Sequence, residues 1–68
     1  MEYTKDDLLE AKRQIDSTLH KLREAIKTLQ AKENPARYRS QITLAERRVR
    51  AFELANALIE REANIYRS

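Results

Sequence analysis

The chain has 68 residues, no cysteine, no glycine and one proline, and its 14 basic and 11 acidic side chains leave a net charge of +3. Such a length allows one domain at most, and the lack of cysteine excludes disulfides and thiolate metal sites. Because sheets and tight turns rely on glycine, we expect an all-α protein that is helical almost throughout.

The start of the chain, MEYTKDDLLE, has neither the basic segment nor the apolar core of a signal peptide. No apolar run approaches the length of a membrane span. We therefore expect a cytoplasmic protein that makes no contact with a membrane.

The first predicted helix runs from about residue 5 to about residue 32. Thr4 followed by Asp7 fits an N-cap with an acidic residue at the third helical position. Apolar residues then recur at helical spacing and form a narrow amphipathic stripe. The members of this stripe are Leu8, Ile15, Leu22 and Leu29, with Ala11, Thr18 and Ala25 between them and Leu19 and Ile26 beside them.

The segment KENPA, residues 32–36, is expected to end this helix. The residue before a proline is pushed out of the α region, so Asn34 should close the first helix and cap the second. Pro35 would then occupy the first position of a second helix that runs from about 35 to about 66. A connection of two residues, 33–34, forces the helices antiparallel, and the prediction is a single helical hairpin.

The second helix carries two apolar stripes. The first is expected to pack on the first helix, with Ala11 facing Asn56, and consists of Tyr38, Ile42, Ala45, Val49, Phe52, Asn56, Ile59, Ala63 and Tyr66. An amide inside such a stripe can fix register, and we expect Lys12 or Thr18 to be the partner of Asn56.

The second stripe widens the apolar arc beyond what one helix can cover. It consists of Leu44, Arg48, Ala51, Ala55, Leu58, Glu62 and Ile65, and is nearly palindromic about Ala55. Against an antiparallel copy of itself, Leu44 would meet Ile65. In the same pairing Arg48 would meet Glu62, so the stripe suits a two-fold interface.

A chain this small usually needs a partner to support its core. We therefore predict a homodimer in which two hairpins form a four-helix bundle of coiled-coil type, with the second stripe as the dimer interface. The alternatives are a parallel dimer, a tetramer and a hetero-assembly.

The arginines of the second helix form an alternative site. Residues 35–68 carry a net charge of +3, and all of their cations are arginines, which favour bidentate contacts to phosphate or carboxylate. Glu46 and Glu53 interrupt this basic face, which is typical of a solvated surface, whereas a nucleic-acid site favours a clean basic stripe. The candidates for nucleic-acid contact are Arg37, Arg39, Arg47, Arg50 and Arg61.

The sequence contains no catalytic constellation. There is no glycine-rich phosphate loop and no cysteine nucleophile, and His20 is the only histidine. We predict no catalytic, cofactor-binding or metal-binding residue and no small-molecule substrate. The favoured hypothesis is a non-enzymatic, homo-oligomeric interaction or regulatory module that recruits another protein, and the alternative is a small nucleic-acid-binding dimer.

Two short patterns lie along the predicted hairpin. Residues 15–18 read Ile-Asp-Ser-Thr, and the second helix contains Thr-Leu-x-x-Arg-Arg and then Leu-Ile-x-x-Glu. The later residues are Thr43, Leu44, Arg47, Arg48, Leu58, Ile59 and Glu62. Together they resemble small uncharacterised helical-hairpin proteins of Gram-positive bacteria and their mobile elements. The resemblance implies a cytoplasmic bacterial protein and brings no known activity.

Two further resemblances concern topology and one short segment. In length and predicted hairpin topology the chain is similar to the small dimer that regulates plasmid copy number by binding paired RNA loops. Arg13, Ile15, Asp16 and Arg23 resemble the first helix of the small all-helical chorismate mutases. The third helix of that enzyme fold has no counterpart in this sequence.

Overall fold

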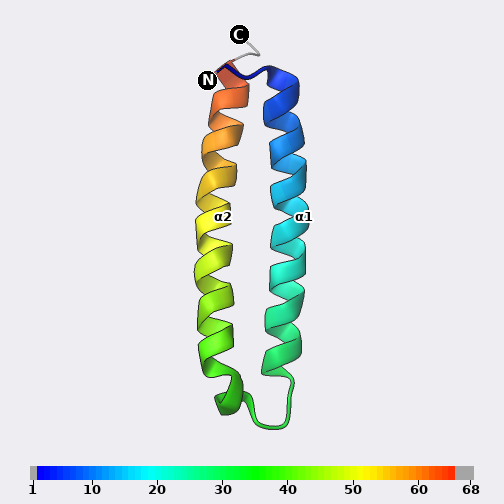
Figure 1. The fold of residues 1–68 in the computed structure, drawn as a ribbon, viewed down its shortest axis with the longest axis vertical. Helices are drawn as coiled ribbons and strands as arrows, with labels where there is room; N and C mark the ends of the chain where they lie inside the picture. The colour runs from blue at the N-terminus through cyan, green and yellow to red at the C-terminus, as the bar shows by residue number, and fades with distance from the viewer. Residues whose placement is uncertain (1, 66–68) are drawn as a thin grey trace.

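In a computed structural model, the protein is an antiparallel helical hairpin (Figure 1). The structure describes residues 2–65. Their elements are helix α1, Lys5–Gln30, a short 3₁₀ helix η1, Pro35–Tyr38, and helix α2, Arg39–Ile65. The start of α1 and the end of α2 lie at one end of the rod, and the turn lies at the other (Figure 1). The predicted all-α hairpin is therefore confirmed.

Helix α1 begins with the predicted cap. The backbone N–H of Asp7 donates to Thr4 Oγ1 at 3.1 Å, and the backbone N–H of Thr4 donates to Asp7 Oδ2 at 2.8 Å. Two N–H groups that the helix leaves unpaired are thus satisfied reciprocally. The acidic side chains of this first turn also complement the helix dipole.

The turn is longer than the sequence predicts. α1 ends at Gln30, and four residues, 31–34, lead to η1. Asn34 stands at the N-cap position of η1, but its side chain makes no capping hydrogen bond, so the prediction that it caps the second helix is wrong. Its ψ of 74° departs from the extended backbone of a capping residue, such as the 169° of Thr4. The backbone carbonyl of Asn34 instead accepts from the N–H of Arg37 at 3.1 Å.

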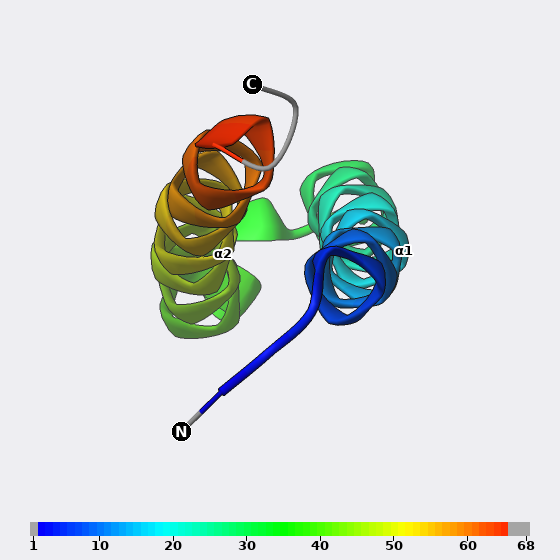
Figure 2. The ribbon, with the colours of Figure 1, turned by 90° about the horizontal axis from the view of Figure 1, so that it is seen from above.

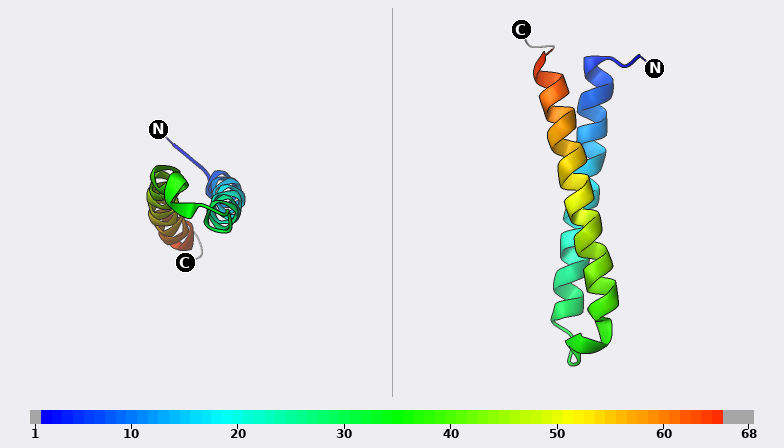
Figure 3. Two further views of the ribbon diagram at one scale, coloured as in Figure 1. Left: turned by 90° about the horizontal axis from the view of Figure 1, so that it is seen from below. Right: turned by 90° about the vertical axis from the view of Figure 1, so that its left-hand side faces the viewer.

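The interface between α1 and α2 is narrow. Seen end-on, the molecule is a pair of helices with no further layer (Figure 2), and the second view of Figure 3 shows that they cross along the rod. Only Leu8, Leu19 and Ala63 are buried among the described apolar residues, and they remain 4–8% exposed. The other described members of the first stripe of α2 are half-buried, and Tyr66 lies outside the described residues.

A polar contact lies within this interface. Asn56 Nδ2 donates to Asp16 Oδ1 at 2.7 Å, and Lys12 Nζ donates to Asp16 Oδ2 at 3.3 Å. Asp16, and neither Lys12 nor Thr18, is therefore the partner of Asn56. Thr18 turns its hydroxyl to the carbonyl of Gln14 in the preceding turn, at 3.0 Å, as a hydroxyl in a helix commonly does.

Candidate interaction surface on helix α2

Four large apolar side chains of α2 are exposed in one row. They are Leu44, Leu54, Leu58 and Ile65, which are 48–64% exposed, and we call them the outer row. At about 100° per residue, the mean direction of the outer row lies about 150° around α2 from the stripe that packs on α1. The outer row therefore faces away from α1.

The residues predicted to form the dimer interface differ in exposure. Leu44, Arg48, Ala51, Leu58 and Ile65 are exposed, whereas Ala55 and Glu62 are half-buried. Glu62 contacts the segment that precedes α1, because its Oε1 accepts a hydrogen bond from the Tyr3 hydroxyl at 3.3 Å.

Leu54 is the residue of the outer row that the sequence prediction omitted. It is 63% exposed, one of the highest fractions among the large apolar side chains. It fits an alternating spacing of three and four from Leu44 through Ala51 to Leu58, and that signal could have identified it.

Two shallow hollows lie along the outer row. One is lined by Arg47, Arg50, Ala51 and Leu54, and the other by Leu58, Arg61, Glu62 and Ile65. Each combines apolar side chains with arginine at its edge. Such a surface suits the side chains of another helix, which pack into the grooves between residues three and four apart.

The five candidate arginines are all exposed, but the structure does not bring all of them together. Arg37 in η1 and Arg39 at the start of α2 lie next to the turn. Arg47 and Arg50 follow two to three turns later and share a hollow. Arg61 lies about 16 Å further along α2 than Arg50, and a glutamate stands on each side of it in the sequence.

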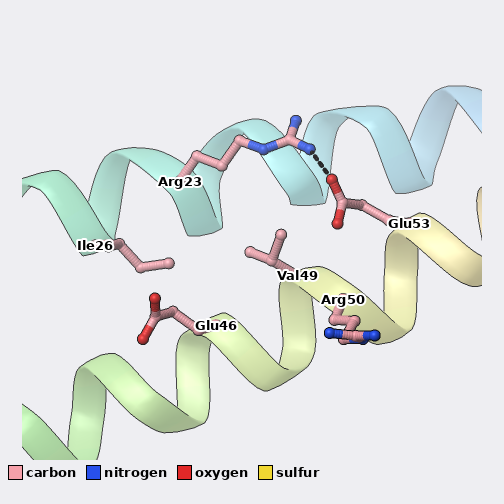
Figure 4. A pocket seen from close by; sticks show the side chains of 6 residues that line it. All are labelled: Arg23, Ile26, Glu46, Val49, Arg50 and Glu53. Carbon is pink, nitrogen blue, oxygen red and sulfur yellow. Dashed lines mark hydrogen bonds and ion pairs between the residues drawn. The ribbon is translucent and has the colours of Figure 1, made fainter.

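Carboxylates interrupt the basic side of α2, as the sequence predicts. Glu53 Oε2 accepts from Arg23 Nη2 of α1 at 2.7 Å, and both side chains are 52% exposed. Figure 4 shows this ion pair, with Ile26 of α1 and Glu46 and Val49 of α2 beside it. An exposed pair of this kind contributes about 0.2–1 kcal/mol. Because Glu46 and Glu53 stand among them, the arginines of α2 form no continuous basic stripe.

Charge is segregated along the rod. We call residues 20–51 the turn half, which carries nine basic and three acidic side chains, a net charge of +6. We call residues 2–19 and 52–65 the terminal half, which carries four basic and eight acidic side chains, a net charge of −4. Because the hairpin folds at residues 31–34, these charges lie at opposite ends of a molecule that measures 51 × 19 × 15 Å.

Neither a metal-binding cluster nor a membrane-spanning helix is found in the described part of the chain. Within residues 2–65 no three His, Asp or Glu side chains gather so as to hold a metal ion. Neither α1 nor α2, over the residues described, contains a stretch long and apolar enough to cross a membrane. The surface of the described residues is marked by the outer row and by the segregated charge.

No protein-family model matches this chain, nor does any curated protein or solved structure. The resemblance to hairpin proteins of Gram-positive bacteria therefore stays a prediction. What defines the protein is its own geometry, a two-helix hairpin with an exposed apolar row and oppositely charged halves.

Proposed function

We propose that the protein is a non-enzymatic helical module that self-associates through α2 and, as a homodimer, recruits another protein with its outer faces. The outer row is the observation that carries this proposal. Single exposed apolar residues are common on protein surfaces, but several large ones aligned on one face of a helix are typical of an interaction site. The small number of buried apolar residues gives the chain a further reason to bury more.

Sedimentation equilibrium tests this proposal directly. The unaltered chain should have the mass of a dimer, and Leu58→Glu should be monomeric, because a carboxylate in an apolar interface costs several kcal/mol. Ala57→Glu is the matched control, since it adds the same charge one residue away, about 100° around the helix. Both variants should keep the circular dichroism of a helical protein.

Two outcomes of this experiment would contradict the proposal. One is a monomeric mass for the unaltered chain at the highest concentration reached. The other is a dimer that Leu58→Glu and Ala57→Glu affect equally, because the outer row would then take no part in association.

The net charge of +6 on the turn half supports a second candidate function, a nucleic-acid-binding dimeric regulator. Fluorescence anisotropy with duplex DNA and structured RNA would detect it. Phosphate contacts predict an affinity that falls log-linearly with salt and is reduced by Arg39→Glu more than by Arg61→Glu, which lies outside the turn half. Absence of binding at low salt would leave the arginines as a solvated surface.

A further inference from the structure

We infer that the outer row is covered by α2 of a second, antiparallel copy of this chain, with the turn half of each hairpin against the terminal half of the other and Leu54 at the two-fold axis. This inference rests on the proposed function, because it presumes self-association. It goes further by fixing the orientation, the register and the shape of the dimer.

The first argument is the symmetry of the outer row. A two-fold interface requires a surface that is complementary to itself. When α2 is set against an antiparallel copy so that paired residue numbers sum to about 109, Leu44 meets Ile65 and Ala51 meets Leu58. The two copies of Leu54 then meet at the centre. On either side of this centre the small Ala51 lies opposite the large Leu58, which suits interdigitated packing.

The second argument is charge complementarity. Packed helices lie about 8–10 Å apart, close to the Debye length of about 8 Å at physiological salt. Each half of the 51 Å rod is several times longer than that, so each half responds mainly to the half beside it. The charges of α2 itself follow the same division, with +3 on residues 39–51 and −2 on residues 52–65. An antiparallel copy sets these opposite charges side by side, whereas a parallel copy sets like charges side by side.

At the level of single residue pairs, only some of the charges that would face each other across the seam are opposite. On the flank of the seam nearer α1, Arg48 would lie opposite Glu62 of the second copy. Arg47 points in the same direction around α2 as Ile65, five turns away, and would lie opposite Arg61. The complementarity is therefore a property of the halves and not of every pair.

The third argument concerns the shape of the dimer. In a closed four-helix bundle, the two neighbours of each helix lie about 90° apart around it. The outer row lies about 150° from the stripe that packs on α1. The two copies of α2 would therefore lie at the centre of an open layer, with one copy of α1 at each edge. This layer differs from the closed bundle that the sequence predicts.

Engineered cysteines test the orientation, because the chain has no cysteine of its own. Leu44→Cys and Ile65→Cys should form a disulfide-linked dimer when mixed, and neither should do so alone. In the antiparallel register two copies of residue 44 lie about 30 Å apart, whereas a disulfide needs Cα atoms within about 7 Å. Ala57→Cys, mixed with either variant, is the control that should not link.

Each result decides a different point. Disulfides formed by Leu44→Cys alone and by Ile65→Cys alone would show a parallel seam and overturn the inference. A dimeric mass with no disulfide in this mixture, nor in a mixture of Ala51→Cys with Leu58→Cys, would also overturn it. A monomeric mass for the unaltered chain would instead refute the proposed function itself, so the two failures are distinguishable.

Discussion

At the scale of single residues, the contact between Asp16 and Asn56 ties the two helices together. The hydrogen bond from the Asn56 amide, and then the bond from Lys12, lower the pKa of the Asp16 carboxyl below its ordinary value of 3.8. The amide oxygen of Asn56 is buried and accepts no hydrogen bond from any described residue. The orientation of this amide is therefore set by Asp16.

This contact should make stability depend on pH. Because the pKa of Asp16 is lower in the folded state, its ionised form stabilises the fold above the ordinary value, and this contribution is lost as pH falls through the folded-state pKa. Asn56→Ala should therefore lower the thermal midpoint more at neutral pH than well below pH 3.8. Circular dichroism melts would measure it, with the exposed Asn64→Ala as the control. An equal effect of Asn56→Ala at both pH values would contradict the role given to Asp16.

At the scale of helices, the start of α1 could be predicted and the exposed face of α2 only in part. The capping box needs only residues 4–7, so its signal is local. The exposed face depends on the helical period, and a seven-residue repeat drifts about 20° per heptad on a straight helix. Over the three heptads from Leu44 to Ile65, the direction of the row around the axis of α2 therefore turns by about 60°. It moves away from the direction of Ala55 and toward that of Leu54.

The turn and the partner of Asn56 could not be predicted for a similar reason. Asn34 would cap an α turn after Pro35, but the structure has a 3₁₀ turn there and no side-chain cap. A proline at the first position is compatible with either kind of turn, so the sequence does not distinguish them. Asp16 lies beside the apolar stripe of α1. Its contact with α2 therefore depends on how the two helices cross and on their relative rotation, which the spacing of apolar residues does not specify. The two stripes that face each other depend only on spacing. Their described members are half-buried or buried as predicted, except Ala25, which is exposed.

A charge exchange on α2 tests the seam at this scale. Arg48→Glu should weaken dimerisation about tenfold, because both symmetric copies of this pair in the seam would set a glutamate against Glu62. Tenfold corresponds to about 1.4 kcal/mol. Adding Glu62→Arg should restore the affinity. The dimerisation constant can be measured by sedimentation equilibrium. An unchanged constant in Arg48→Glu would place the seam elsewhere.

At the scale of the whole molecule, segregated charge is a product of folding. Along the sequence, residues 1–34 are neutral and residues 35–68 carry +3, which is only a mild asymmetry. The hairpin combines the end of one helix with the start of the other, and the same residues then give +6 and −4 at opposite ends. The prediction of a basic second helix was thus an incomplete description of the surface, because the basic half includes lysines and Arg23 of α1.

The dependence of dimerisation on salt follows from this segregation. Two copies regarded as points of net charge +3 repel each other, so salt would then strengthen association. Two antiparallel rods attract through their opposed halves, so salt should weaken association instead. Between about 0.01 M and 1 M salt the Debye length falls from about 30 Å to about 3 Å, and we expect the dissociation constant to rise about tenfold. Sedimentation equilibrium at several concentrations of sodium chloride would measure it. A dissociation constant that falls with salt would favour a parallel seam, in which like halves lie together.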